Sequence, residues 1–399
     1  MPLAKETKRA ILIIVLANFI ICLGWGLIIP VEPFIKIEYH LTAGQMGFMT
    51  SLYAFAQFVF SPIVGKVSDK YGRAPILTTG LLLYMVAELL FAVAGTVLWF
   101  NISRIIGGIS AAMVGTASMA MAADLSSDKD RAKVIGWISA ALSGGLIIGP
   151  GIGGVLANIS YKTPFWFAGI SGLIAAIVFM VGLPQHLKAQ SHGDLVDGIS
   201  ITEKGFKSIM SKAIIILFAM ILISSFGLAG FESIYTLYVN QVFHFTLNEI
   251  ALVLILNGIF SLILQVVLFD RMVNMFSEIG LTRICFAIGT LSTVWILVAH
   301  TQIEVIIATL FIFCSFDILR PSITTMLTRF GKNNQGLING VNMSLTSIGN
   351  IIGPIFAGGL MDINPHIPYI IVAVILGISA LITFIVSHEM KINQNIKTN

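Results

Sequence analysis

The segment SGGLIIGPGIGG at Ser143–Gly154 is matched 204 residues later by SIGNIIGPIFAG at Ser347–Gly358, and seven of the twelve positions are identical. Both copies lie inside long apolar runs, and each contains a Gly-Pro pair, at Gly149-Pro150 and Gly353-Pro354. A repeat spaced by about half the chain indicates two similar halves, because solenoid repeats recur at shorter periods. Gly and Pro interrupt helices in water, whereas in membrane helices they allow a bend or close backbone packing. We therefore expect corresponding membrane helices in two related halves.

The composition places the chain in a membrane. Hydrophobic residues make up 57% and charged residues 11%, against about 25% charged residues in soluble domains. The mean hydropathy is +0.94, and the 399 residues suffice for about twelve spans of 20–25 residues. The basic residues form no stripe, so the net charge of +4 does not indicate nucleic-acid binding. Cys22, Cys285 and Cys314 all lie in apolar segments, which argues against a disulfide framework or a CxxC site.

The apolar runs predict twelve spans, the first of which is too long for a signal-peptide core and is expected to be retained. The predicted spans are 10–34, 44–64, 75–97, 99–123, 132–158, 164–184, 213–240, 247–269, 280–300, 303–327, 336–361 and 366–388. The one long polar joint, 185–212, follows the sixth span. It predicts an N-terminal six-helix bundle at 1–184, a linker at 185–212 and a C-terminal six-helix bundle at 213–399.

The positions of Lys and Arg predict the orientation. With a cytoplasmic N-terminus, 19 of the 23 basic residues fall in inner segments, two (Lys36 and Lys162) in outer segments, and two (Arg104 and Arg320) within spans. Basic residues concentrate on the cytoplasmic side of membrane proteins. We therefore expect both termini in the cytoplasm of a multi-pass protein of the plasma membrane, here a bacterial cytoplasmic membrane.

The joint after the second span carries a specific motif. It reads GKVSDKYGR at Gly65–Arg73, with Gly65, Asp69, Gly72 and Arg73 in the pattern G-x-x-x-D-[KR]-x-G-[RK]. This pattern resembles the loop signature of the major facilitator superfamily, in which two six-helix halves rock about a midplane site. The resemblance implies that the acid latches one conformation by meeting basic groups and a helix N-terminus of the other half. An ordinary positive-inside loop is the alternative.

The fifth span resembles a second signature of that superfamily, found in its antiporters. In G-x-x-x-G-P-x-x-G-G, this chain has Gly145, Gly149, Pro150, Gly153 and Gly154. A smooth, bent helix surface of this kind is expected to let the halves seal against each other, and the resemblance implies export.

The remaining resemblance is to twelve-helix drug/proton antiporters of the NorA/Bmr multidrug exporter type. It rests on FGLAGFESIY at Phe226–Tyr235 and FDILRP at Phe316–Pro321, with a first-span segment GWGLIIPVEP at Gly24–Pro33. Similarity runs nearly end to end, but Glu32 occupies a position between two prolines where an apolar residue is expected. The resemblance implies proton-coupled efflux of hydrophobic, mainly cationic or zwitterionic drugs, without a cofactor.

Charged residues inside spans are costly, so each is expected to have a partner or a function. Glu232 has no basic residue within a turn of its own span, and burial disfavours the charged form of an acid. We therefore predict that Glu232 carries protons and attracts cations. Asp317 and Arg320 are three residues apart and share a helix face. They form either a structural ion pair or, as the resemblance implies, the second acid and its cation.

Three further charged residues lie in or near the predicted spans. Arg104 lies in a segment resembling a fourth-span signature whose Arg is implicated in proton transfer, although its depth would also allow snorkelling to the interface. Glu32 is either a vestibule acid or, as we favour, an interfacial residue. Glu88 is expected to make a structural hydrogen bond in a peripheral span.

The helix period and the resemblance also predict which uncharged side chains line the cavity. Rings and polar groups suit flat, hydrophobic cations through stacking and cation–π contacts. The predicted set is Phe231, Tyr235, Phe316, Asn342 and Gln57.

The sequence argues for a monomeric transporter in the lipid bilayer, with drugs and protons as its partners, and not for an enzyme. The seven His are scattered without a metal-ligand spacing, so no metal site is expected, and a phosphate loop of the GxxxxGK[ST] kind is missing. Two other functions stay open. A carrier of one metabolite, a sugar or a peptide, would favour more Asn, Gln and Trp at the midplane. A receptor or scaffold without transport would leave Glu232 and Asp317 unexplained.

Overall fold

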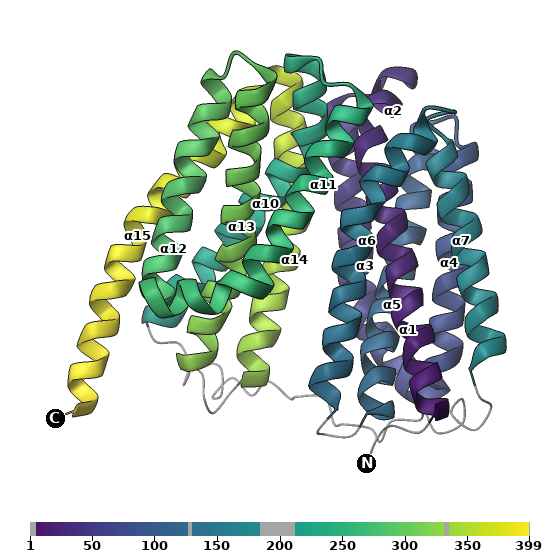
Figure 1. Cartoon of the computed structure of the whole chain (residues 1–399), viewed down its shortest axis with the longest axis horizontal. Helices are drawn as coiled ribbons and strands as arrows, with labels where there is room; N and C mark the ends of the chain where they lie inside the picture. The colour runs from purple at the N-terminus through teal and green to yellow at the C-terminus, as the bar shows by residue number, and fades with distance from the viewer. Residues whose placement is uncertain (1–4, 127–129, 184–211, 331–334, 399) are drawn as a thin grey trace. The chain divides into compact units, whose positions relative to one another are not determined.

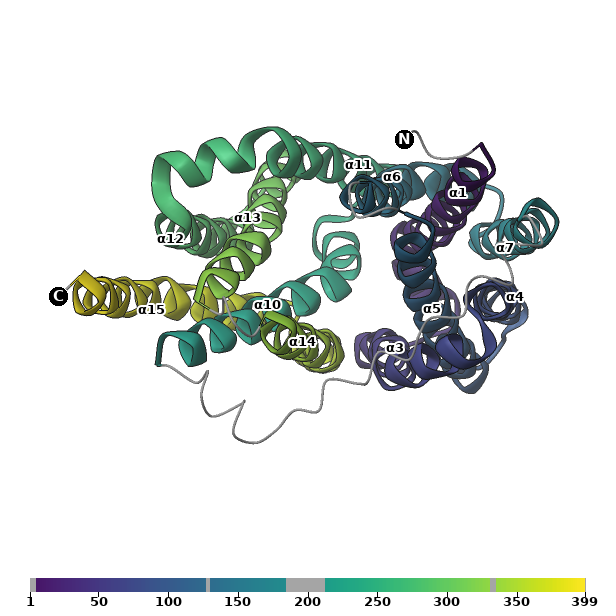
Figure 2. The ribbon, with the colours of Figure 1, turned by 90° about the horizontal axis from the view of Figure 1, so that it is seen from below.

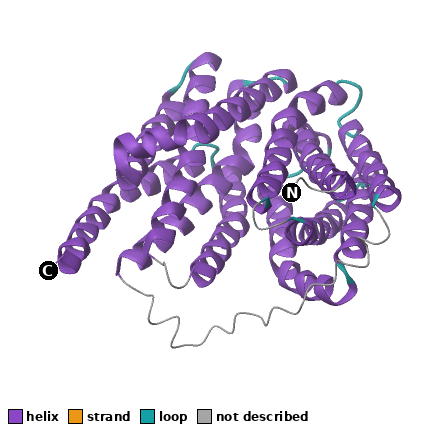
Figure 3. Ribbon diagram, turned by 60° about the horizontal axis from the view of Figure 1, so that its bottom comes forward, coloured by secondary structure: helices purple, strands orange, loops and turns teal. Residues whose placement is uncertain are grey.

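The computed structural model describes residues 5–126, 130–183, 212–330 and 335–398, and within these ranges it contains helices and no strand (Figures 1 and 3). The helices are α1 (Lys5–Ile28), η1 (Ile29–Val31), α2 (Glu32–Glu38), α3 (Ala43–Tyr71), α4 (Arg73–Val93), α5 (Val97–Leu125), α6 (Arg131–Ala157), α7 (Thr163–Gly182), α10 (Lys212–Phe243), α11 (Leu247–Ile263), η2 (Leu264–Leu268), α12 (Phe269–Val298), α13 (Gln302–Phe330), α14 (Gln335–Ile363) and α15 (Ile367–Thr398). The predicted linker at 185–212 lies, except for its last residue, outside the described residues. An all-helical membrane protein is therefore confirmed.

Eleven described helical segments are long and apolar enough to cross a membrane. One of them, Leu247–Val298, has 52 residues and would measure about 78 Å as a straight helix, against a hydrocarbon core of about 30 Å. Its path is broken at Ser277, which has φ 60° and ψ 163°, and Figure 2 shows the chain running sideways before α12 continues. This segment thus holds two spans, as predicted at 247–269 and 280–300, so the described helices provide the expected twelve.

The described residues form two compact units. Unit 1 lies within Met1–Leu41, Leu52–Val196 and Thr246–Gly258, and unit 2 within Thr42–Ser51, Asp197–Phe245 and Ile259–Asn399. Unit 1 therefore includes the start of α11, and unit 2 includes the start of α3. The six-helix bundles at 1–184 and 213–399 remain a prediction.

In unit 1, the first copy of the repeat packs against α1. A Cβ atom added to Gly145 would lie 2.6 Å from the Leu23 backbone nitrogen, and one added to Gly149 would lie 2.7 Å from the Gly26 Cα. Gly153 is closer still to the Leu27 carbonyl, at 2.2 Å. Glycines four residues apart share one helix face, so the motif forms a continuous strip of backbone contact. The predicted close packing of this helix is confirmed.

In unit 2, the second copy packs against α10 in the same way. A Cβ on Gly349 would lie 2.7 Å from the Phe226 nitrogen, and one on Gly353 would lie 2.8 Å from the Gly230 nitrogen. Gly349 and Gly353 occupy the repeat positions of Gly145 and Gly149. The repeat in sequence is thus a repeat in structure, because one copy packs α6 against α1 and the other packs α14 against α10 through the same glycine positions.

The last glycines of each copy contact a different helix, which explains the composition of the two units. Gly154 lies against Ala251 of α11, at 2.9 Å for an added Cβ, and Gly358 lies against the Ala43 carbonyl of α3, at 2.4 Å. In unit 2, the Asp362 carboxylate accepts hydrogen bonds from the backbone N–H groups of Ala43 and Gly44, both at 2.7 Å. An acid distant in sequence therefore caps the start of α3.

Candidate functional site

The Gly65–Arg73 motif covers the last two turns of α3, the connecting residue Gly72 and the first residue of α4, and it centres on an arginine with two acids. Arg73 donates through Nη1 to Asp69 at 2.8 Å and through Nε to Asp124 of α5 at 2.5 Å. The turn requires Gly72, whose φ of 94° lies in the region that disfavours other residues. Asp124 is a partner that sequence reasoning missed, because nothing in its spacing connects it with the motif. The latch role implied by the resemblance stays a prediction.

Replacing Arg73 by Met is expected to lower the stability of the protein in detergent by about 1–2 kcal/mol, because two acids then face each other without their cation. The Arg73 side chain is 11% exposed, while those of Asp69 and Asp124 are about one-third exposed, so solvent screens part of the loss. The thermal midpoint of purified protein measures the effect. Lys66→Met in the same motif, at an exposed position, is the control and should leave the midpoint unchanged. Equal midpoints for the two variants would contradict the proposed network.

Unit 2 brings together the three charged residues predicted on spans seven and ten. Glu232 on α10 interacts electrostatically with both Asp317 and Arg320 of α13. Glu232 and Arg320 are exposed and Asp317 is half-buried, although the neighbours Phe231 and Ile234 are 0% and 1% exposed. The charged side chains are thus less covered than the apolar side chains next to Glu232 in the chain. The structure thus places Glu232 near Asp317 and Arg320, which the sequence of either span alone does not predict.

The expected ion pair between Asp317 and Arg320 is not present. In the described part of the chain these two side chains do not approach within 4 Å, and the Asp317 carboxylate instead accepts a hydrogen bond from Ser261 of α11. The Ser261 hydroxyl in turn accepts a hydrogen bond from Gln265 at 2.8 Å. Arg320 interacts electrostatically with Glu232 on the other helix. Ser261 and Gln265 were missed because their helix face could not be assigned from an almost uniformly apolar span.

The predicted aromatic residues lie in the core of unit 2. Phe231, Tyr235 and Phe316 are 0%, 1% and 2% exposed. The Phe231 ring lies edge-on to the rings of Phe313 and Tyr369, each at 5.2 Å between centroids. These five residues are here called the Phe231 cluster. Contact of Phe231, Tyr235 and Phe316 with a substrate therefore stays a prediction, since their rings are covered in this conformation.

The other predicted cavity residues lie on α14, α3 and α2. Asn342 on α14 donates to the Thr324 hydroxyl of α13 at 3.3 Å, and Gln57 on α3 is exposed. Glu32 is the half-buried first residue of the short helix α2, a position that suits the interfacial role favoured from the sequence.

Arg104 is buried in unit 1 and does not snorkel. It is 6% exposed, its Nη2 lies 3.5 Å from Glu88 Oε2, and its guanidinium stacks over the Phe91 ring at 4.4 Å. The snorkelling alternative is therefore wrong, because Glu88 and Phe91 from α4 hold the cation inside the unit. Glu88, expected to make a structural hydrogen bond, is the partner of this arginine.

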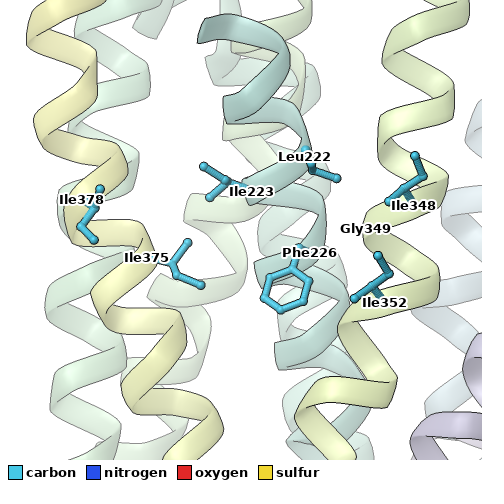
Figure 4. A pocket seen from close by; sticks show the side chains of 8 residues that line it. All are labelled: Leu222, Ile223, Phe226, Ile348, Gly349, Ile352, Ile375 and Ile378. Atoms are coloured by element: carbon cyan, nitrogen blue, oxygen red, sulfur yellow. The ribbon is translucent and has the colours of Figure 1, made fainter.

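A purely hydrocarbon cavity lies among α10, α14 and α15 (Figure 4). Its volume is about 390 Å³, and its lining residues are Leu222, Ile223, Phe226, Ile348, Gly349, Ile352, Ile375 and Ile378. No charged or amide side chain reaches it, so it can accept an apolar group but cannot distinguish charges.

Among the described residues no group of three or more His, Cys, Asp or Glu side chains could hold a metal ion. The three cysteines are free thiols.

Comparisons with known proteins cover almost the whole chain. The family model described as Major Facilitator Superfamily matches residues 14–345. Multidrug resistance protein 1 of Bacillus subtilis (strain 168) is 40% identical over 379 residues, which are 95% of this chain and 96% of that protein. Quinolone resistance protein NorA of Staphylococcus aureus (strain MRSA252) is 32% identical over 97% of this chain and 99% of that protein.

Solved structures share the fold at low sequence identity. A bacterial homologue of the human lysosomal transporter Spinster, in an inward-facing and occupied conformation, has a TM-score of 0.81 at 14% identity, covering 96% of this chain and 97% of that chain. The nucleoside transporter NupG has a TM-score of 0.80 at 13% identity, covering 96% and 99%. The family match, the relatives and the fold agree, and the chain belongs to the major facilitator superfamily, in the branch that contains these multidrug and quinolone resistance proteins.

Proposed function

We propose that this protein exports hydrophobic, mainly cationic or zwitterionic drugs in exchange for protons. The observation that carries the proposal is the trio of Glu232, Asp317 and Arg320, in which the exposed Glu232 interacts electrostatically with a second acid and with a cation. The names of the relatives in Bacillus and Staphylococcus support drugs as the substrate class. The protein is proposed to act as a monomer in a bacterial cytoplasmic membrane, with both termini inside.

The trio supplies the exchange by electrostatics. With both acids ionised the trio has a net negative charge and attracts a lipophilic cation. With both acids protonated it has a net positive charge and repels that cation. Protons that enter from outside therefore displace the drug outward, and proton release to the cytoplasm restores the binding state. Because Asp317 and Arg320 are not locked in a close ion pair, the cation remains available to respond to Glu232.

The driving force is sufficient for export. One elementary charge moving across the membrane is worth about 2.3 kcal/mol per 100 mV. At 1.4 kcal/mol per tenfold concentration ratio, one inward proton can sustain a roughly 40-fold gradient of a neutral drug. A pH gradient adds to this value.

Transport of ethidium tests the proposal. Purified protein is reconstituted into liposomes, the interior is made acidic relative to the medium, and ethidium uptake is followed by fluorescence. Molecules inserted inside-out should accumulate the dye until nigericin collapses the gradient, whereas protein-free liposomes should not. Uptake that is missing for ethidium and for other lipophilic cations would overturn the multidrug proposal and favour the single-metabolite carrier.

A further inference from the structure

The interior of unit 1 contains a second set of buried ionisable groups, separate from the trio in unit 2. Glu88 of α4 and Arg104 of α5 are 3% and 6% exposed. They interact electrostatically with Tyr53 of α3 and Tyr84 of α4, and Cys22 of α1 interacts with both tyrosines. Four helices thus direct titratable side chains to one place, while α7, which also packs against α4, carries no titratable residue.

The pair is poorly built for a purely structural role. A strong arginine–carboxylate pair is bidentate and measures about 2.7–2.9 Å, but here one contact of 3.5 Å joins Arg104 Nη2 to Glu88 Oε2. The Arg104 Nε is buried without a hydrogen-bond partner, as are the Tyr84 hydroxyl and Asn101 Oδ1 one turn before Arg104. Burying an incompletely paired ion pair is unfavourable compared with packing hydrophobic residues of similar size. Such a cluster of unmet donors and acceptors calls for an explanation beyond packing.

The surrounding structure holds this pair in place without depending on its charges. The Ser103 hydroxyl donates to the Ala87 carbonyl at 2.8 Å, and the Ser110 hydroxyl donates to the Gly80 carbonyl at 2.8 Å. These two bonds join α4 to α5, one beside the pair and one about two turns further along both helices. The aromatic stack of Phe91 on Phe165, at 4.3 Å between centroids, supports the ring under Arg104. The helices therefore have their own attachments, and the ion pair is available for another role.

We propose that Glu88 is a second proton-exchanging carboxylate of the transporter, with Arg104 as its counter-ion in unit 1. A proton that binds Glu88 neutralises the carboxylate and leaves Arg104 as an uncompensated buried cation, which is released from the pair. Loss of the proton restores the pair. Glu88 and Arg104 both lie within about two turns of the α4–α5 connection. In the proposed orientation this is the outer side, where protons enter. The role in coupling rests on the proposed function, whereas proton binding by Glu88 does not.

Infrared difference spectroscopy on purified, reconstituted protein tests proton binding directly, without a drug. Acidification is expected to produce a carboxyl C=O band that is lost in Glu88→Gln and retained in Glu232→Gln. A spectrum in which Glu88→Gln removes no band would overturn the proposal. This result would be independent of whether ethidium is transported at all, so the two failures are distinguishable.

Transport by a charge-free double variant separates proton exchange from a structural pair. Glu88→Gln alone leaves Arg104 buried without its acid and can misfold, whereas Glu88→Gln combined with Arg104→Met removes both charges and should fold. We expect this double variant to exchange ethidium down its concentration gradient. Its pH-driven accumulation should fall by about 5- to 150-fold, the usual range of a coupling between sites. Wild-type accumulation by the folded double variant would show that the pair is only structural.

The conservative variant and a matched control assign the effect to the carboxylate. Glu88→Asp keeps an acid at this position and should recover part of the accumulation, with a displaced pH profile. Ser103→Ala removes the neighbouring hydrogen bond between the same two helices but no charge, and should leave the pH profile unchanged. A profile displaced equally by Ser103→Ala would contradict the assignment to Glu88.

Discussion

Replacing Glu232 by Gln is expected to abolish proton-driven ethidium accumulation, with a loss of about 100-fold, within the range of coupling free energies between two sites. The amide has nearly the same shape as the carboxyl group but neither ionises nor binds an additional proton near neutral pH. The exposed position of Glu232 beside Arg320 means that the substitution removes charge without opening a cavity in the core. The measurement is ethidium uptake by liposomes with an acidic interior, compared at equal amounts of reconstituted protein.

Glu38→Gln is the matched control for this prediction. Glu38 is an exposed acid at the end of α2, and the same chemical change there should leave accumulation unchanged. Drug counterflow, measured without a pH gradient, separates coupling from binding. Glu232→Gln should retain counterflow of an uncharged drug and lose more of the counterflow of ethidium, because the trio no longer attracts the cation. Accumulation that survives Glu232→Gln would keep the exporter but assign coupling to Asp317 or Arg104.

The sequence predicts the fold well because the decisive signals are local or repeated. Apolar runs locate the spans, and the two Gly-Pro copies at Gly149-Pro150 and Gly353-Pro354 locate the close contacts with α1 and α10. Even the break at Ser277, between two predicted spans, falls where the polar residues separate the apolar runs. In lipid, every span must satisfy its own backbone hydrogen bonds, so hydropathy largely determines these elements.

The site is predicted less completely because it depends on how neighbouring helices are rotated. Glu232 stands out in an apolar span, but its proximity to Arg320 follows only from the packing of α10 on α13. Spacing within α13 suggested a partner for Asp317 on its own helix, whereas the structure provides Ser261 from α11. Similarly, Arg104 and Glu88 are 16 residues apart and meet only because α4 and α5 are antiparallel neighbours. The helical period predicts which residues share a helix face, but the residues that this face contacts depend on how the helices pack.

Gly149→Ala is expected to destabilise the protein by about 1–3 kcal/mol, the usual cost of inserting a methyl group into a filled contact. The added Cβ would lie 2.7 Å from the Gly26 Cα and 2.8 Å from the Leu23 carbonyl oxygen. These are backbone atoms, so no side-chain rotation relieves the overlap and α1 must move away from α6. Thermal unfolding in detergent, followed by the loss of the monomeric gel-filtration peak, measures the change. The repeat predicts a similar loss for Gly353→Ala, whose Cβ would lie 2.8 Å from the Gly230 nitrogen.

The control for this prediction, Gly144→Ala, is expected to change the stability of the protein in the opposite direction. At Gly144, in the same helix, an added Cβ would lie 3.6 Å from the nearest atom, a ring carbon of Phe19, which is ordinary contact. Alanine there should stabilise the helix by about 0.5–1 kcal/mol, because glycine loses more backbone entropy on folding. A membrane helix that merely tolerates glycine would give both substitutions the same small gain. Opposite shifts for Gly144→Ala and Gly149→Ala would instead show that the repeated motif selects glycine for backbone contact between helices. A similar loss for Gly353→Ala would extend this requirement to unit 2. Gly353 occupies the repeat position of Gly149 but contacts α10 instead of α1.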